Sequence, residues 1–166
     1  MYVHVRGHGN AVDLARVVAK AIALTKTPPT SPPAAARARV DFDVDAVERA
    51  IGSKGRVAGG GLQVRVPPRE AVTEEGAALP AGMGAAGSIV NFQPTGAGRA
   101  IVVADFALLG TEVTAVARGL TARGFEITAL HNHMLSETPR MFYLHVMAQG
   151  DAVALAAAIR TAIARR

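Results

Sequence analysis

Three of the five histidines of the chain lie within fifteen residues of one another, at positions 131, 133 and 145. Glu137 and Arg140 lie between them. Imidazole nitrogens with a carboxylate are a donor set that suits Zn²⁺, Mn²⁺, Fe²⁺ or Ni²⁺, and the residue types alone do not choose among these metals. The stretch therefore indicates a site for a divalent metal or a small polar ligand.

Whether the histidines meet depends on the pairing of two predicted strands, 125–131 and 141–147. Histidines two residues apart in a strand face the same side. If residue 131 pairs with residue 143, His145 lies diagonally across from His131, about 5.5–8 Å away between backbones. A shift by one residue moves His145 to the opposite face. The apolar alternation of the second strand favours the first register, because its helix-facing set is then Phe142, Leu144 and Val146.

Each side chain of this constellation has an expected role. His131, His133 and His145 are the expected metal ligands. Glu137 is the expected fourth ligand or the general base, and Arg140 is the expected contact for an anionic group. If the protein is an enzyme, a metal-activated water in hydrolase or lyase chemistry is the simplest mechanism.

Three further residues are candidate substrate contacts. Tyr143 shares the face of His145 in the favoured register. Asp105 interrupts an apolar strand, which places its carboxylate near a strand end or in the site. Asn91 opens a polar cluster at the end of another strand.

A non-catalytic binding or assembly module is the alternative interpretation. In that case the histidines stabilise the hairpin, Asn132 hydrogen-bonds a loop, and Arg140 forms a surface salt bridge with Glu137. A single buried histidine is more often structural than catalytic, so the hypothesis of a site rests on the convergence of the whole set.

The periodicity of the chain predicts an α+β protein. Helices are expected over 10–25, 42–51 and 111–124, and from Asp151 onward, with N-caps at Asn10, at Asp43 or Asp45, at Thr111 and at Asp151. Strands are expected over 2–6, 87–93, 99–106, 125–131 and 141–147, with a strand or hairpin over 56–66 and a possible short strand at 71–73. From residue 99 the order is strand, helix, strand, strand, helix. This order is most of a ferredoxin-like split βαβ unit, in which helices cover one face of an antiparallel sheet.

A repeat relates the two ends of the chain. Moving residues 2–23 by 141 positions aligns them with 143–164 and gives identity at about half of the positions, Tyr, His and Gly included. His4 takes the position of His145, but no His-Asn-His precedes it. The repeat predicts three parts: a strand-helix remnant of a preceding copy over 1–25, a Pro/Ala-rich linker over 26–41, and a full domain over 42–166. Because a lone strand-helix cannot bury its own faces, a homodimer that exchanges residues 2–24 is expected.

Composition narrows the class of protein. The 166 residues are 50% hydrophobic but only 4% aromatic, with no cysteine, which excludes disulfides and thiolate metal sites. The net charge of +5 comes from scattered arginines with few aromatics for base stacking, so we expect no nucleic-acid partner. The sequence contains no signal-peptide pattern and no apolar run of about eighteen residues. A cytoplasmic protein without a membrane span is therefore expected.

These motifs resemble the LppY/LpqO family of bacterial proteins. The resemblance covers about 42–164 and is most specific at Ala129-Leu-His-Asn-His-Met134. Other matching stretches are 45–52, 82–84, 91–96, 105–106, 112–113, 139–140 and 150–151. Family members commonly carry two tandem copies of the unit and are often exported, which agrees with the repeat, but the resemblance implies no established reaction.

Overall fold

The structure is a computed structural model that describes residue 5 and residues 7–25, 39–80 and 87–164. The chain divides into two compact units, Met1–Ala36 and Arg37–Arg166, which are described separately. Apart from residue 5, the expected strand over 2–6 lies outside the described residues, as does nearly all of the expected linker over 26–41.

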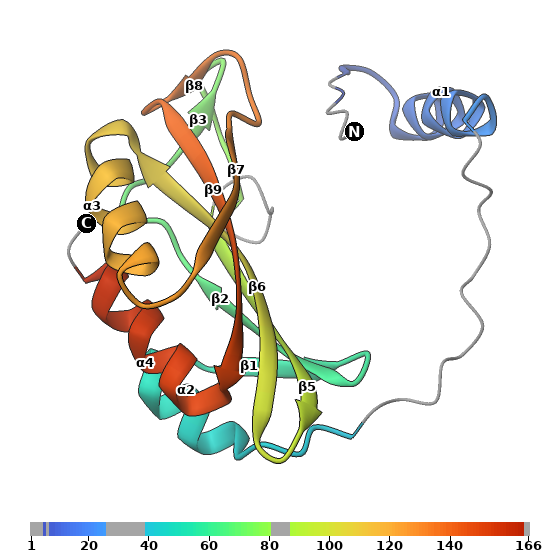
Figure 1. Ribbon diagram of the computed structural model, residues 1–166. Helices are drawn as coiled ribbons and strands as arrows, with labels where there is room; N and C mark the ends of the chain where they lie inside the picture. The colour runs from blue at the N-terminus through green and yellow to red at the C-terminus, as the bar shows by residue number, and fades with distance from the viewer. Residues whose placement is uncertain (1–4, 6, 26–38, 81–86, 165–166) are drawn as a thin grey trace. The chain divides into compact units, whose positions relative to one another are not determined.

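Six strands of the larger unit form one sheet in the order β1-β2-β5-β6-β9-β7 (Figure 1). Every neighbouring pair is antiparallel. The strands are β1 (Gly55–Ala58), β2 (Gly61–Val66), β5 (Ser88–Gly96), β6 (Arg99–Leu109), β7 (Glu126–His131) and β9 (Met141–Asp151). The predicted strands over 87–93, 99–106, 125–131 and 141–147 are confirmed, and the segment 56–66 is a hairpin that turns at Gly59-Gly60.

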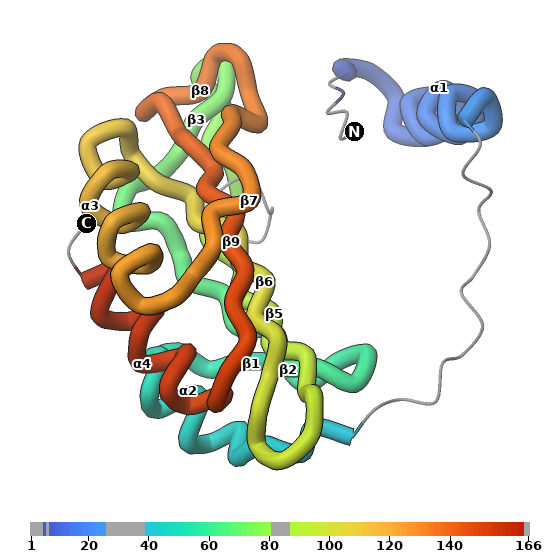
Figure 2. The backbone as a smooth tube through the Cα atoms, viewed as in Figure 1, coloured from blue at the N-terminus to red at the C-terminus, as the bar shows by residue number. Residues whose placement is uncertain are grey.

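Three helices cover one face of this sheet (Figures 1 and 2). They are α2 (Val44–Ile51), α3 (Gly110–Thr121) and α4 (Ala152–Ile163). Side chains alternate between the two faces of a strand, and the even-numbered residues of β6 and β9 point toward the helices. They form the main core with buried apolar side chains of α4, among them Val102, Ala104, Phe106, Leu144, Val146, Leu155, Ile159 and Ile163. The α+β class with helices on one face is therefore confirmed.

The connection through α3 has a split βαβ form. β6 and β7 are both antiparallel to β9, which lies between them, so β6 and β7 run parallel to each other. A ferredoxin-like unit continues after its second helix to a strand beside the first. Here that place beside β6 is taken by β5, which precedes it in the chain. The ferredoxin-like assignment is not confirmed.

The helices of the larger unit begin at the predicted N-cap residues, with one exception. Asp43 accepts a hydrogen bond from Ala46 N–H at 2.9 Å, and Asp151 accepts one from Ala154 N–H at 2.8 Å. The expected cap at Thr111 is wrong, because β6 runs directly into α3 and Thr111 already lies in its first turn. The side chain of Glu112 instead accepts the Leu109 N–H at 2.8 Å, and its charge complements the positive end of the helix.

A second, smaller sheet packs over part of the face that carries no helices. Its strands are β3 (Thr73–Glu74), β4 (Ala77–Ala78) and β8 (Glu137–Thr138), in the order β4-β3-β8. β8 is a correction, because no strand was expected between the predicted strands 125–131 and 141–147. The side chains between the two sheets form a second apolar cluster, with Val72, Ala107, Met141 and Tyr143 buried and Leu79, Leu109 and Met134 partly buried.

The smaller unit contains the helix α1 (Ala11–Ala23). Asn10 caps it as predicted, accepting hydrogen bonds from Val12 N–H at 2.9 Å and Asp13 N–H at 3.3 Å. The helix buries no residue. Four of its large apolar side chains, and Leu24 just after it, are exposed, namely Val12, Val17, Val18 and Ile22, whereas Leu14 is partly exposed.

The main core makes a testable prediction at Ile159, whose side chain is fully buried between α4 and the sheet. Ile159→Ala should lower the free energy of unfolding by about 2–5 kcal/mol, because it removes buried methylene groups and leaves a cavity. Ile127→Ala, at a position 39% exposed on β7, is the matched control and should cost less than about 1 kcal/mol. Urea unfolding of both variants measures the difference, and equal losses would contradict this assignment of the core.

Candidate metal centre

The pairing of β7 with β9 places the histidines on one face of the sheet. His131 lies opposite Tyr143, and Ala129 lies opposite His145. His145 is therefore diagonal to His131, on the face that carries no helices. This is the register that the sequence favoured.

A β-bulge at Thr128 makes this register possible. Nearer the start of β7, Glu126 pairs with Met147 and Ile127 with Val146, but the register shifts by one residue between Ile127 and Ala129. Without the extra residue, residue 131 would pair with residue 142 and the imidazole of His131 would point toward the helices. The bulge therefore turns this side chain toward His145.

The three imidazoles are close enough to share one ion. The Nε2 atoms of His131 and His145 are 2.8 Å apart, and one ligand nitrogen from each of the three histidines, His133 included, lies within 4.8 Å of the others. All three residues are partly buried. Nitrogens that share a tetrahedral Zn²⁺ at 2.0–2.1 Å are about 3.3 Å apart, which is close to the spacing of these ligand atoms.

Tyr143 holds the imidazole of His133 by stacking. The two rings are parallel, with centroids 3.5 Å apart. The rings of His131 and His145 stack as well, at 4.7 Å and 18°. Because Tyr143 is fully buried in the second apolar cluster, the small sheet fixes one wall of the histidine cluster.

The segment between β7 and β9 is held by its own polar side chains. Asn132 donates to the Met141 carbonyl at 2.6 Å. The side chain of Glu137 is completely buried, and its carboxylate accepts the Met141 N–H at 3.1 Å and a hydrogen bond from Arg140 Nη1 at 3.1 Å. Arg140 also donates to the carbonyls of Met134 and Leu135. Glu137 and Arg140 thus brace the loop, and Glu137 lies outside the three-histidine group.

Asp105 supplies a carboxylate beside the histidines. It lies directly opposite His145 on the neighbouring strand β6, and its Oδ1 is 3.6 Å from His145 Nε2. Asn91 is on the same face of the sheet but two strands from β9, where it accepts a hydrogen bond from Gln63 Nε2 at 2.9 Å. The structure therefore groups Asp105 and Tyr143 with the histidines and keeps Asn91 away from them.

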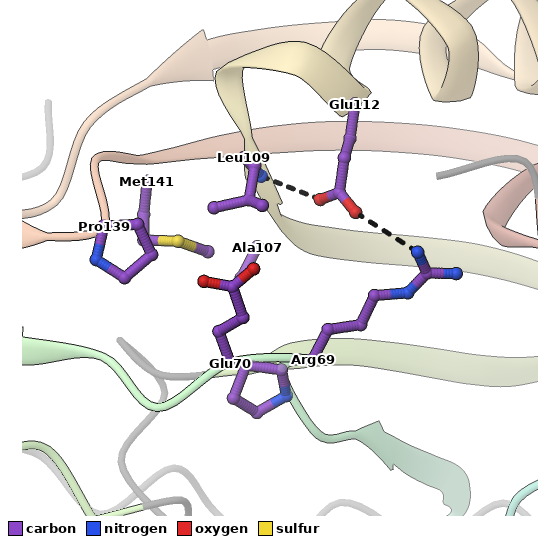
Figure 3. A pocket seen from close by; sticks show the side chains of 8 residues that line it. Arg69, Glu70, Ala107, Leu109, Glu112, Pro139 and Met141 are labelled. Carbon is purple, nitrogen blue, oxygen red and sulfur yellow. Dashed lines mark hydrogen bonds and ion pairs between the residues drawn. The ribbon is translucent and has the colours of Figure 1, made fainter.

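A small pocket beside this region combines acidic and basic side chains with apolar ones (Figure 3). Arg69 Nη1 is 4.0 Å from Glu112 Oε1, and Glu70 also lines the pocket. Its floor includes Ala107 and Met141 from the second apolar cluster. None of the three clustered histidines lines it. The residues of this pocket come from three separate segments of the chain, 68–70, 107–112 and 139–141, so no local sequence pattern marks it.

Burial changes the acidity of Tyr143. It raises the pKa of the phenol to about 12, and the negative charges of Glu137 and Asp105 contribute further. The phenol is therefore protonated at neutral pH, and its hydroxyl can donate a hydrogen bond near the histidines.

Most of the larger unit, including the histidine group, matches one protein family. Residues 45–165 match the family described as Domain of Unknown Function (DUF1259), and the chain belongs to this family. The matched residues include every member of the histidine group. No curated protein and no solved structure matched the chain. Among the described residues, no helix has both the length and the apolar character that a membrane crossing needs.

The raised pKa of Tyr143 gives a pH prediction. Protonation of the phenol favours the folded state, so this contribution to stability is complete below pH 10 and is lost as the pH rises from 10.0 toward about 12. The chain has two tyrosines, and Tyr2→Phe leaves Tyr143 as the only phenol. Phenolate absorbance of the folded variant should titrate with a midpoint near 12. A midpoint at the ordinary value of 10.0 would contradict the burial of this side chain.

Proposed function

We propose that the protein binds one divalent transition-metal ion at His131, His133 and His145. The observation that carries the proposal is the convergence of three imidazole nitrogens within 4.8 Å, two of them only 2.8 Å apart. Three neutral imidazoles are a common set of protein ligands for Zn²⁺, and Mn²⁺, Fe²⁺ and Ni²⁺ also accept nitrogen donors.

The carboxylate of this site is Asp105 in our proposal, in place of the expected Glu137. Asp105 lies on a central strand with an oxygen 3.6 Å from the nitrogen of His145. Glu137 is fully engaged by Arg140 and by the Met141 N–H. We therefore assign Glu137 and Arg140 to holding the loop that carries His133.

A metal held by three imidazoles keeps open coordination positions, and a bound divalent ion acts there as a Lewis acid toward a polar ligand. The side chains around it are suited to orienting such a ligand. The Tyr143 hydroxyl stays protonated, and Asp105 is the carboxylate available as a proton acceptor. Hydrolase or lyase chemistry on a small polar substrate is the reaction class that this set supports.

The motifs that resemble the LppY/LpqO family lie inside the part of the chain that matches the DUF1259 family. The His-Asn-His-Met stretch lies inside the matched range 45–165, which also contains the Asp105-Phe and Pro139-Arg140 pairs. We infer that the DUF1259 family and the LppY/LpqO family describe the same group of proteins.

The parallel stacking of His133 on Tyr143 favours a second candidate function. In this alternative the protein is a non-catalytic binding or assembly module, and the histidines stabilise the junction of β7, β9 and the small sheet. The direct contact between His131 and His145 then serves as a hydrogen bond between one neutral donor ring and one acceptor ring.

Metal analysis separates the two functions. Protein purified without a histidine tag and incubated with Zn²⁺ or Mn²⁺ should retain about one equivalent per chain after dialysis, and its melting temperature should rise. The double variant His131→Ala/His133→Ala should lose this metal and keep its circular dichroism spectrum. Less than about a tenth of an equivalent, with no change in melting, would leave only the structural alternative.

Three further variants test the ligand set. Asp105→Asn should weaken metal affinity by about 10–100-fold, as expected for a carboxylate that coordinates or orients a ligand. Glu137→Gln should lower thermal stability and change metal affinity by no more than a few-fold. A larger loss of affinity would show that Glu137 is a metal ligand. His8→Ala, in the other unit, is the matched control for nonspecific binding to histidine.

We also propose that residues 2–24 pack against the main unit of a second copy of the chain. The support is the exposed apolar face of α1, whose Leu14, Val18 and Ile22 align with Leu155, Ile159 and Ile163 of α4. These three α4 side chains are buried, which shows the kind of apolar surface that the repeated helix needs.

Light scattering tests this exchange. The full chain should have the mass of a dimer at micromolar concentration, and Val18→Asp/Ile22→Asp should convert it to a monomer. Val57→Asp, at an exposed position of the main unit, is the matched control and should remain dimeric. A strict monomer for the unmodified chain would remove the proposal.

A further inference from the structure

The face of the sheet without helices continues past the histidines to a pair of arginines. The residues opposite one another across four strands form one row, which consists of Arg65 on β2, Ile89 on β5, Asp105 on β6 and His145 on β9. All four side chains point to the same face, because directly paired residues of antiparallel strands share a face. The arginine therefore lies on the same surface as the histidine cluster, three strands away.

Arg56 is the second member of the pair. It lies opposite Gln63 on β1, and Gln63 is two residues before Arg65 on β2, so both arginines are on the same face and diagonal to each other. Diagonal positions in a sheet are about 7–8 Å apart at the backbone, within reach of two long side chains that converge on one group. Both arginines are exposed.

A groove in the surface runs beside these side chains. One hollow is lined by Lys54, Gly55, Arg56, Gln63 and Arg65. A second hollow, which shares Arg56 and Gln63 with the first, continues to the polar side chains of Asn91 and Gln93 on β5. The groove thus contains positively charged groups at one end and amide groups at the other.

One cation at the border of the groove, Lys54, is already paired with carboxylates. Lys54 is engaged by Glu48, with Nζ 2.6 Å from Oε2, and lies 3.9 Å from Asp45. These two carboxylates therefore balance the charge of the lysine.

We propose that Arg56 and Arg65 bind an anionic oxygen group, a phosphate or a carboxylate, of a small ligand. Guanidinium groups match the oxygen geometry of both anions and form charge-assisted, often bidentate, hydrogen bonds with them. Gln63 fits between the two arginines as a further donor or acceptor, and its Nε2 already donates to Asn91. The site is independent of the metal centre and opens on the same face of the sheet.

Amide NMR of the full chain in metal-free buffer tests this site. Inorganic phosphate should produce saturable shifts confined to β1, β2 and the start of β5, and sodium acetate is the second probe. Arg56→Gln and Arg65→Gln should each weaken phosphate binding by about tenfold, the effect of losing a charged hydrogen bond. Arg118→Gln, on α3 at the opposite face of the sheet, is the matched control and should bind phosphate like the unmodified chain.

Saturation by both probes supports the shared oxygen chemistry, and saturation by phosphate alone supports a phosphate group. Shifts that grow linearly up to high phosphate concentration, or equal losses in the Arg118→Gln variant, would overturn the proposal. Because the titration contains no metal, it can succeed where the metal experiment fails, so the two proposals stand or fall separately.

Discussion

The register of β7 against β9 is the constraint on which the candidate site depends. Side chains alternate between the faces of a strand, so one residue more or less reverses the direction of every side chain beyond it. The bulge at Thr128 supplies that residue and brings His131 opposite Tyr143. Ile127 and Leu130 lie opposite Val146 and Leu144 on the helix-facing side, while the imidazole of His131 joins the other side. One unpaired backbone position thus decides which face of the sheet His131 occupies.

The parts that could be predicted from the sequence are those encoded over short distances along the chain. Asn10, Asp43 and Asp151 cap helices through bonds to amides two or three residues later, and such signals are readable locally. The β7–β9 register at His131 was favoured over the shifted one, because the apolar alternation of β9 places Phe142, Leu144 and Val146 toward the helices. The bulge itself could not be predicted, since no residue type between Glu126 and His131 marks it.

The parts that could not be predicted depend on residues far apart in the sequence. β8 exists because Glu137 and Thr138 pair with β3, more than sixty residues earlier. The side chain of Glu137 has the chemistry of a metal ligand, but this long-range pairing and Arg140 place it in a buried brace. Asp105 approaches His145 only through the β6–β9 ladder. The sequence therefore indicated the types of group at the site, and the tertiary pairing selected which carboxylate lies there.

The position of β7 at the edge of the sheet has a consequence for the timing of ligand exchange. An edge strand has one neighbour, so it separates from the sheet by local unfolding more readily than a central strand does. His131 travels with β7, whereas His145 and Asp105 stay on central strands. A bound ion would cross-link β7 to the central strands. Local unfolding of β7 would then set how fast the ion dissociates, and slower hydrogen exchange along 126–131 would report that the ion is bound.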